Sequence, residues 1–336
     1  MNSEQGDNLS PRTPIALWSP RLFQNFRKRT TGNIRPATMV FLRSIILGSL
    51  MAFVACACGS GASAEDAGKE FRVGLIGADP GQILQDFDPF VVYLGSRLRG
   101  SGIRDVTVIV VKDVDQMHTR VKEGKLDFIL ASAFPIVEME RDGLVPTVLA
   151  VQGTAREYPA VFFVRKQSSL RGLGDLRGKT VVFGTPSSTA GYAMAKAVLI
   201  MNNVAVSETT AGPAHGGAVR CEFAGEAINQ AFRVIRDRAD AGVFSSSDWS
   251  ELSRKERSQL RIIHRTAPVI NLLGSFHPSF PPALREVVEN TLIDMSGSGS
   301  GRTALATALN MTRFERLTEE DRNSLRRLKK LLSDAE

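Results

Sequence analysis

Hydrophobic and polar positions alternate with two different periods along the first half of the chain. The runs "FRVGLIG" (71–77), "DVTVIVV" (105–111) and "FILASAF" (128–134) are short and apolar, which predicts three buried strands. Between them, "FDPFVVYLGSRLRG" and "VDQMHTRVKEGKLD" have helical spacing, and the second run closes at Gly124. Strand–helix–strand–helix–strand is the order of an α/β layer in which helices cover parallel strands.

The same kind of pattern returns in the second half, without clear repetition of the sequence. "PTVLAVQG", "PAVFFVRK", "KTVVFG" and "AGVFSS" predict strands, while "INQAFRVIRDRAD", "PPALREVVENTLIDM" and "EEDRNSLRRLKKLL" predict helices. Two α/β lobes joined by extended crossovers near 152–164 and 262–272 account for this order. We therefore expect residues 65–160 and 266–336 to form the first lobe and 161–265 the second.

The residues before the first predicted strand have the character of an export signal. Arg43 precedes an apolar run, Ser44 to Ala55, that is too short for the roughly 20 residues of a membrane-spanning helix but has the length of a signal-peptide core. We therefore interpret 1–64 as an N-terminal extension plus leader, with translation starting at Met39.

Two kinds of processing remain open for this leader. "FVAC" resembles a bacterial lipobox, which would leave Cys56 as a lipidated N-terminus, and "ACAC", ending at Cys58, is a weaker version. "ASA" before Glu65 instead fits ordinary signal peptidase. We favour the lipoprotein, and either route exports the protein. Only Cys221 lies in the mature body, which leaves no intramolecular disulfide framework.

The net charge of +7 is mostly a property of the leader. Seven of the 42 lysines and arginines but only two of the 35 acidic residues fall within 1–64, so the rest of the chain is close to neutral. A nucleic-acid-binding protein is expected to carry a basic patch on its folded body. We therefore expect no nucleic-acid partner, and membrane contact only through a lipid anchor.

Signals for catalysis or cofactor binding are weak. The glycines of "LRGLGDLRGK" precede a strand and have the wrong spacing for a dinucleotide fingerprint. The four histidines, at 118, 215, 264 and 277, show no metal-ligand spacing, and the chain lacks a "GxSxG" elbow. A triad assembled through space stays open, but we expect neither an enzyme nor a cofactor.

The stretch "PSSTAG" (186–191) is the strongest candidate for a binding site. Ser187 or Ser188 could simply cap the following helix. Alternatively, Ser188 and Thr189 could offer hydroxyls, and the helix start its free N–H groups, to an oxyanion. The stretch follows a strand of the second lobe, where ligands bind in α/β sheets, and this position favours the oxyanion site.

Four segments together resemble a known family. These are "VGLIG…DPFVVYLGSRL", "VKEGKLDFILASAFPIV", "SLRGLGDLRGKTVVFGTPSSTAGY" and "SFPPALREVV", and they span most of 70–310. They resemble the substrate-binding proteins of phosphonate and phosphite ABC transporters, within the type II periplasmic binding-protein class. The resemblance implies two α/β lobes with the ligand in the cleft, a monomer, and membrane permease and ATPase subunits as partners.

The resemblance also assigns residues in the second lobe to the ligand. Ser188, Thr189 and Ala190 take the places of the family's phosphonate clamp, where Ala190 replaces a serine and can contribute only its N–H. His215 in "GPAHGG" resembles a histidine that touches the phosphonate, although it could equally be a solvated loop residue. Ser245 stands where the family often has an aspartate that binds an aminoalkyl group.

In the first lobe, "LDFILASAFPIV" stands where the family usually has Gly-Pro and a nearby tyrosine. Ser132 and Ala133 replace the Gly-Pro pair and Ile136 replaces the tyrosine, so that Ser132 is the remaining donor. Because a serine at 245 cannot neutralise a buried ammonium, we expect a small oxyanion without an amine, such as phosphite, phosphate or methylphosphonate.

The function expected from these features is exported binding of a small phosphorus oxyanion for an ABC transporter. Three alternatives remain open: a lipid-anchored sensor or accessory protein of the same fold, a secreted enzyme, and a binder of another small anion, since the fold does not determine the ligand.

Overall fold

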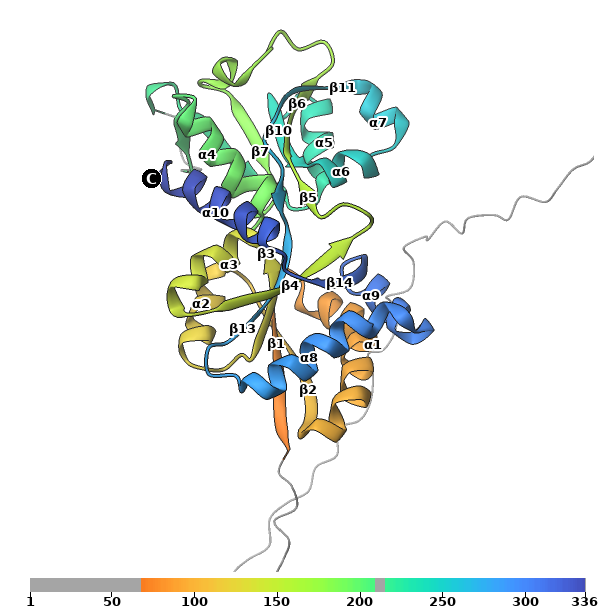
Figure 1. Ribbon diagram of the computed structural model, residues 1–336. Helices are drawn as coiled ribbons and strands as arrows, with labels where there is room; N and C mark the ends of the chain where they lie inside the picture. The colour runs from red at the N-terminus through yellow and green to blue at the C-terminus, as the bar shows by residue number, and fades with distance from the viewer. Residues whose placement is uncertain (1–67, 209–214, 336) are drawn as a thin grey trace, which may run out of the picture. The chain divides into compact units, whose positions relative to one another are not determined.

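The computed structural model describes residues 68–208 and 215–335 (Figure 1). All of them belong to one compact unit, Gly61–Glu336. The predictions for the leader, including Met39 and the lipidation of Cys56, lie outside the described residues. Within the described part of the chain, no helix combines the length and apolar character needed to cross a membrane.

The first sheet has six strands in the order β14-β4-β13-β3-β1-β2. β1 runs parallel to β2 and β3, whereas β13 is antiparallel to β3 and β4, and β14 is antiparallel to β4. The strands are β1 (Lys69–Ile76), β2 (Ile103–Val111), β3 (Phe128–Ser132), β4 (Val145–Gln152), β13 (Leu272–Phe276) and β14 (Met311–Arg316).

Helices cover both faces of this sheet, with α1, α8 and α9 on one side and α2 and α3 on the other (Figure 1). The helices are α1 (Pro80–Leu98), α2 (Val114–Lys122), α3 (Ala133–Met139), α8 (Pro282–Asp294) and α9 (Gly299–Thr307). α1 begins seven residues before "FDPF", because Asp79 caps it and Pro80 takes the first helical position, where a missing N–H costs nothing.

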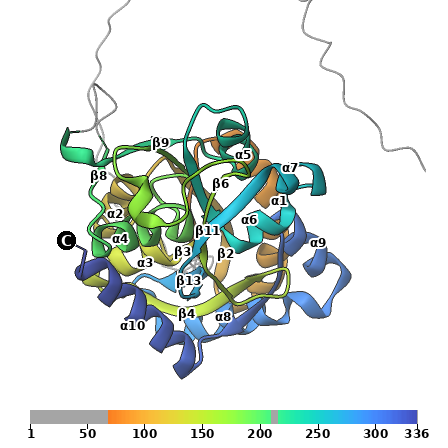
Figure 2. The ribbon, with the colours of Figure 1, turned by 90° about the horizontal axis from the view of Figure 1, so that it is seen from above.

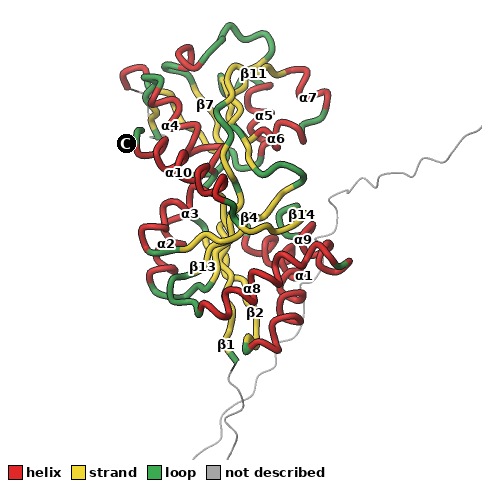
Figure 3. Tube along the Cα trace, in the orientation of Figure 1, coloured by secondary structure: helices red, strands yellow, loops and turns green. Residues whose placement is uncertain are grey.

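The second sheet has the order β11-β6-β10-β7-β9-β8, and its central strand β10 is parallel to β7 but antiparallel to β6. Its strands are β6 (Ala160–Arg165), β7 (Thr180–Phe183), β8 (Val206–Ser207), β9 (Val219–Phe223), β10 (Ala241–Ser245) and β11 (Leu260–Arg265), and its helices are α4 (Met194–Met201), α5 (Ala227–Ile235), α6 (Ser246–Glu251) and α7 (Arg254–Gln259). The tube in Figure 3 shows the strands of both sheets between their helices. The α/β prediction is confirmed.

Two extended crossovers connect the sheets and pair with each other. β5 (Glu157–Tyr158) and β12 (Val269–Ile270) form a two-stranded antiparallel ribbon. Next to it, Ala160 and Thr266 exchange two hydrogen bonds, from Ala160 N–H to Thr266 Oγ1 (2.9 Å) and from Thr266 N–H to the Ala160 carbonyl (3.1 Å). The chain therefore enters and leaves the second sheet at a single point.

The last helix, α10 (Glu319–Ser333), contacts α3 beside the first sheet, α4 beside the second sheet, and the crossover strand β12. The view from above shows α10 near α3 and α4 (Figure 2). Its fully buried Ser324 accepts a hydrogen bond from the N–H of Ile270 in the crossover (3.0 Å). The remaining short helices are η1 (Arg99–Ser101), η2 (Glu140–Asp142), η3 (Leu173–Leu176), η4 (Thr189–Ala193), η5 (His215–Gly217) and η6 (Met295–Gly297).

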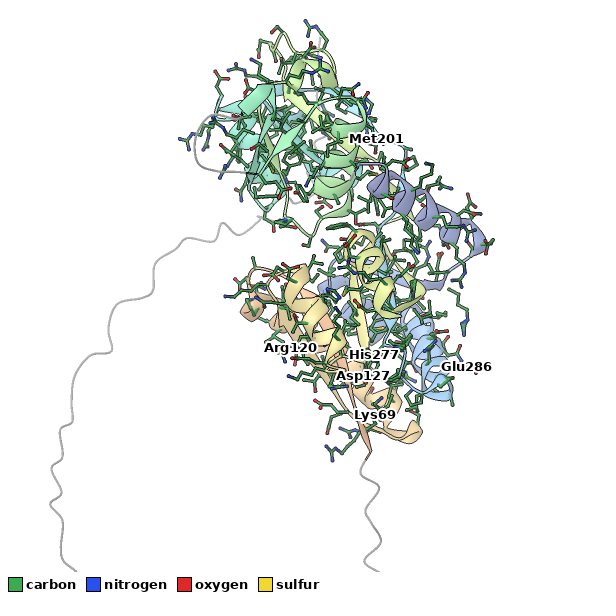
Figure 4. All side chains as sticks on the ribbon, turned by 90° about the vertical axis from the view of Figure 1, so that its left-hand side faces the viewer. Lys69, Arg120, Asp127, Met201, His277 and Glu286 are labelled. Atoms are coloured by element: carbon green, nitrogen blue, oxygen red, sulfur yellow. The ribbon has the colours of Figure 1, made fainter. Side chains whose placement is uncertain are left out.

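One buried carboxylate fastens the amino end of β1. Asp127 is 3 % exposed and pairs with Lys69 (3.1 Å) and Arg72 (2.8 Å). Figure 4 labels Lys69 and Asp127 in this part of the first sheet. Burial alone would raise the pKa of Asp127, but the hydrogen bonds from Arg72 and Lys69 outweigh burial and hold this pKa below its ordinary value. The pair is therefore charged at neutral pH.

Candidate functional site

The stretch between β7 and α4 folds into a tight, doubly capped turn, which we call the clamp loop (residues 184–191). Ser188 N–H donates to the Thr185 carbonyl (3.0 Å), and Ser188 Oγ accepts the N–H of Gly191 (3.0 Å). Gly191 has no room for a Cβ, which would lie 2.8 Å from Ser188 Oγ. The carbonyl of Gly191 accepts the N–H of Gly184 (3.2 Å). The helix that follows the clamp loop begins with η4, a π-helical turn.

The clamp loop meets the first sheet through two hydrogen bonds. Thr189 Oγ1 accepts the N–H of Phe134 at the start of α3 (2.8 Å), and Ser132 Oγ donates to the Ser187 carbonyl (2.8 Å). Thr189 is only 1 % exposed. These bonds bring together residues that lie 55 positions apart in the sequence, at the carboxyl ends of β3 and β7.

A cavity of about 230 Å³ lies at this junction. Four hydroxyl-bearing residues, Ser132, Thr185, Ser187 and Ser188, form one end. The other nine lining residues are apolar and come from the first sheet and its helices and loops, among them Leu75, Ile76, Ile83, Phe87, Leu130 and Leu309. None of the described residues that line this cavity is charged.

Hydrogen-bond donors remain available at the hydroxyl end. Ser188 uses its oxygen as an acceptor and keeps its O–H, and the Thr185–Ser187 hydroxyl pair (3.1 Å) needs only one of its two protons. The N–H groups of Thr189 and Ala190 open η4 and have no acceptor among the residues that the structure describes. Ser188 and the Thr185–Ser187 pair can therefore donate to an oxyanion in the cavity, close to the start of η4 and without a cationic side chain.

The residues singled out from the sequence are distributed unevenly around the cavity. Ser132, Ser187 and Ser188 line it. Thr189 and Ala190 are buried behind its hydroxyl end and do not line it.

Two further residues were predicted to bind the ligand. Ser245 caps α6, where its Oγ donates to Asp248 Oδ2 (2.7 Å), and it does not line the cavity. His215 begins η5 beside residues 209–214, and only its backbone is described.

Behind the clamp loop, Tyr192 connects η4 to the rest of the second sheet. Its hydroxyl donates to Glu208, which also pairs with Lys196, and its ring lies 5.0 Å from that of Phe223. Burial and the Glu208 bond raise the pKa of Tyr192, while the bonds from Lys196 and Tyr192 lower the pKa of Glu208. Tyr192 therefore stays neutral and fixes the back of the clamp loop.

The apolar end of the cavity was not anticipated from the sequence. Leu309, between α9 and β14, adopts the left-handed conformation (φ 62°) and is 39 % exposed at the cavity. Ile83, in the first turn of α1, folds over Gly77, where a Cβ would lie 2.0 Å from Ile83 Cδ1. Of these, only the glycine that ends the first strand is a recognisable sequence signal.

The described residues give little support for a metal site or for a cysteine nucleophile. They contain no group of three or more His, Cys, Asp or Glu side chains that could hold a metal ion. The one described cysteine, Cys221, is buried, and burial raises the pKa of its thiol to about 12.

Comparisons with known proteins show the family and the fold of the chain. A family model described as "ABC transporter, phosphonate, periplasmic substrate-binding protein" matches residues 76–322. The Xanthomonas citri protein XAC2383, solved with chloride and with ATP, is 25 % identical; the alignments cover 79 % of this chain and 98 % of that one, with TM-scores of 0.74 and 0.72.

Two more distant structures share the fold. PhnD1 of Prochlorococcus marinus, in complex with methylphosphonate, is 18 % identical over 79 % of this chain and 99 % of that one (TM-score 0.61). A binding protein component of an ABC phosphonate transporter from Pseudomonas aeruginosa is 16 % identical over 80 % and 97 % (TM-score 0.59). The resemblance drawn from the sequence is thus confirmed, and this chain belongs to the periplasmic substrate-binding proteins of phosphonate ABC transporters.

Proposed function

We propose that this chain binds a small phosphorus oxyanion (phosphite, phosphate or a phosphonate) in the cavity between its two sheets and delivers it to an ABC permease and its ATPase. The observation that carries the proposal is the hydroxyl end of the cavity. There, Ser188 and the Thr185–Ser187 pair keep free protons beside the start of η4. An oxyanion offers the acceptors that these donors lack.

The proposed mechanism is binding by closure of two lobes, 65–160 with 266–336 against 161–265. The bonds from Ser132 to Ser187 and from Phe134 to Thr189 exist only when the lobes meet. A ligand held by the clamp loop and covered by the first lobe gains contacts in the closed form that the open form cannot offer, and so shifts the equilibrium toward closure. The closed form is what the permease recognises.

The same proposal excludes an amine from the ligand. Among the residues that the structure describes, no carboxylate lines the cavity, and Ser245 is engaged by Asp248. An ammonium buried without a counter-charge would lose its hydration without compensation. We further propose that the protein acts as a monomer without cofactor or catalytic step, and that lipidation at Cys56 holds it at the periplasmic membrane surface.

Calorimetry with phosphite, phosphate, methylphosphonate, 2-aminoethylphosphonate, methanesulfonate and ATP tests the proposal. ATP is included because XAC2383 was solved with it, although ATP is far larger than a cavity of 230 Å³. We expect the amine-free phosphorus oxyanions to bind and the others to bind weakly or not at all. Tight binding of 2-aminoethylphosphonate alone would contradict the proposal.

The chain offers a matched control for the clamp residue. Ser188→Ala removes both a helix cap and a free hydroxyl, and we expect it to raise the Kd about tenfold or more, as for a lost hydrogen bond to a charged group. Ser298 caps α9 with the same geometry, accepting the N–H of Gly301 at 3.0 Å, but it does not line the cavity. Ser298→Ala should therefore leave the Kd unchanged, and an equal loss in both variants would refute the role of Ser188.

A further inference from the structure

The cavity is divided into two ends of opposite chemistry. Among the described residues that line it, every side-chain donor lies at the hydroxyl end, whereas nine residues with apolar side chains, from the first sheet and its helices and loops, form the remaining wall. An oxygen placed against that wall would lose its hydration without finding a donor. Phosphate has an oxygen at each of its four corners, so one of them would face this wall in any orientation. The wall is suited instead to a carbon substituent.

Leu309 is held over the cavity at a cost in backbone energy. Leu309 and Asn310 both have positive φ (62° and 53°), a conformation that leucine rarely adopts. Gln152 fixes the turn by donating its side-chain N–H to the Leu309 carbonyl (2.7 Å). The strained backbone carries an apolar side chain that is still 39 % exposed. Backbone strain of this kind costs folding free energy, and it is concentrated at ligand-binding sites.

A second feature shapes the same wall. Gly77 directly follows β1, and any side chain there would collide with Ile83, whose Cδ1 lies 2.0 Å from the position of a Cβ. The glycine thus lets Ile83 fold across the end of β1 and line the cavity together with Leu75 and Ile76. Both Gly77 and Leu309 therefore contribute to an apolar surface beside the hydroxyl end.

We propose that the ligand carries a linear apolar substituent of three or four carbons on its oxyanion head, and that Leu309 selects this substituent. The inference rests on the proposed function and narrows its ligand class. At about 30 Å³ per non-hydrogen atom, the density of liquid water, a cavity of 230 Å³ holds roughly seven or eight such atoms. Phosphite fills about half of that space, whereas propyl- and butylphosphonate fill it.

A homologous series tests the substituent. Calorimetry with phosphite and with methyl-, ethyl-, propyl-, butyl- and hexylphosphonate should show the Kd falling about fourfold per methylene up to propyl or butyl, the gain expected for a buried methylene. Hexylphosphonate should gain nothing further, because its last carbons extend beyond the apolar wall into solvent. 2-Aminoethylphosphonate has the same number of non-hydrogen atoms as propylphosphonate and serves as its polar control; it should bind at least tenfold more weakly. Propanesulfonate shows whether the head must be a phosphonate.

The outcomes separate the two proposals. If phosphite and methylphosphonate bind as tightly as propylphosphonate, the inference about the substituent is wrong while the proposed function stands. If propanesulfonate binds and no phosphorus oxyanion does, the proposed function is wrong while the apolar substituent is upheld. If none of these compounds binds, both are wrong.

Leu309→Asn tests the selecting residue. Asparagine tolerates positive φ better than leucine, so the melting temperature should stay within about 3 °C of the wild type. The preference for propyl- over methylphosphonate, expected to be roughly fifteenfold in the wild type, should fall to about threefold or less. Leu84→Asn is the matched control, since Leu84 is comparably exposed (46 %) but does not line the cavity. An unchanged preference in Leu309→Asn, or an equal loss in Leu84→Asn, would overturn the assignment.

Discussion

Thr189→Val is the most direct perturbation of the contact between the sheets. Valine keeps the shape of threonine but removes the oxygen that accepts the N–H of Phe134 at 2.8 Å. Because Thr189 is 1 % exposed, water cannot replace that oxygen while the contact is closed. The Phe134 N–H, in the first turn of α3, is then left without a partner.

The size of the effect follows from this geometry. A neutral hydrogen bond contributes about 0.5–1.5 kcal/mol, and a buried donor left unsatisfied costs about 1–3 kcal/mol. When the lobes separate, water hydrates both groups, so the penalty falls on the closed form alone. Taking about 2 kcal/mol, closure becomes roughly 30-fold less favourable, and the Kd of the ligand rises by up to that factor, less where the wild type is already largely closed without ligand.

Two measurements test this reasoning. Calorimetry should give the weakened Kd for Thr189→Val, while Thr189→Ser, which keeps the acceptor, should stay within about threefold of the wild type. Small-angle scattering without ligand should show a larger radius of gyration for the valine variant, an effect that a lost ligand contact would not produce. Equal radii together with an unchanged Kd would refute the role assigned to the Thr189–Phe134 bond.

Three further predictions concern stability and reactivity. Asp127→Asn should lower the free energy of unfolding at pH 7 by about 3 kcal/mol, because it leaves Arg72 without its buried partner. Since the pKa of Asp127 is lowered in the folded state, the stability that Asp127 contributes should be complete above about pH 4 and should disappear as the pH falls below it. Urea titrations of the wild type and of Asp127→Asn at several pH values would show both effects. Gly191→Ala should raise the Kd at least tenfold in calorimetry, because the new methyl group displaces Ser188 Oγ. Cys221, with its thiol pKa raised to about 12, should resist Ellman's reagent at pH 8 in the folded protein and react in urea; rapid labelling of the native protein would contradict its burial.

Local sequence patterns were sufficient for the fold and for the position of the clamp loop. Strands such as β1 and β3 are apolar runs with clear ends, and "PSSTAG" follows β7, where a small-residue loop at the carboxyl end of a strand favours ligand binding. By contrast, β9 was not predicted, because its sequence "VRCEF" is short, carries two charged residues and shows no distinctive hydrophobic periodicity.

The details of the cavity depend on contacts that no local pattern encodes. The Thr189–Phe134 bond spans 55 residues and arises only when two separate strand ends meet. The conformation of Leu309 opposes its own backbone preference and is imposed by Gln152 from another strand. Ser188 illustrates the limit best, because the cap and the anion site looked like alternatives in the sequence, whereas a hydroxyl oxygen that accepts from Gly191 still keeps a proton to donate.

The paired crossovers also make the second sheet an insertion whose two ends touch. Ala160 and Thr266 hydrogen-bond each other at the point where the chain leaves and rejoins the first sheet, and every strand of the second sheet lies between them. Insertions with adjacent ends can be exchanged without rebuilding their host. A relative's segment could therefore be transplanted between these two residues, provided that it keeps the α4 surface on which α10 packs. Such chimaeras would let the half proposed to hold the oxyanion and the half proposed to select its substituent be recombined independently.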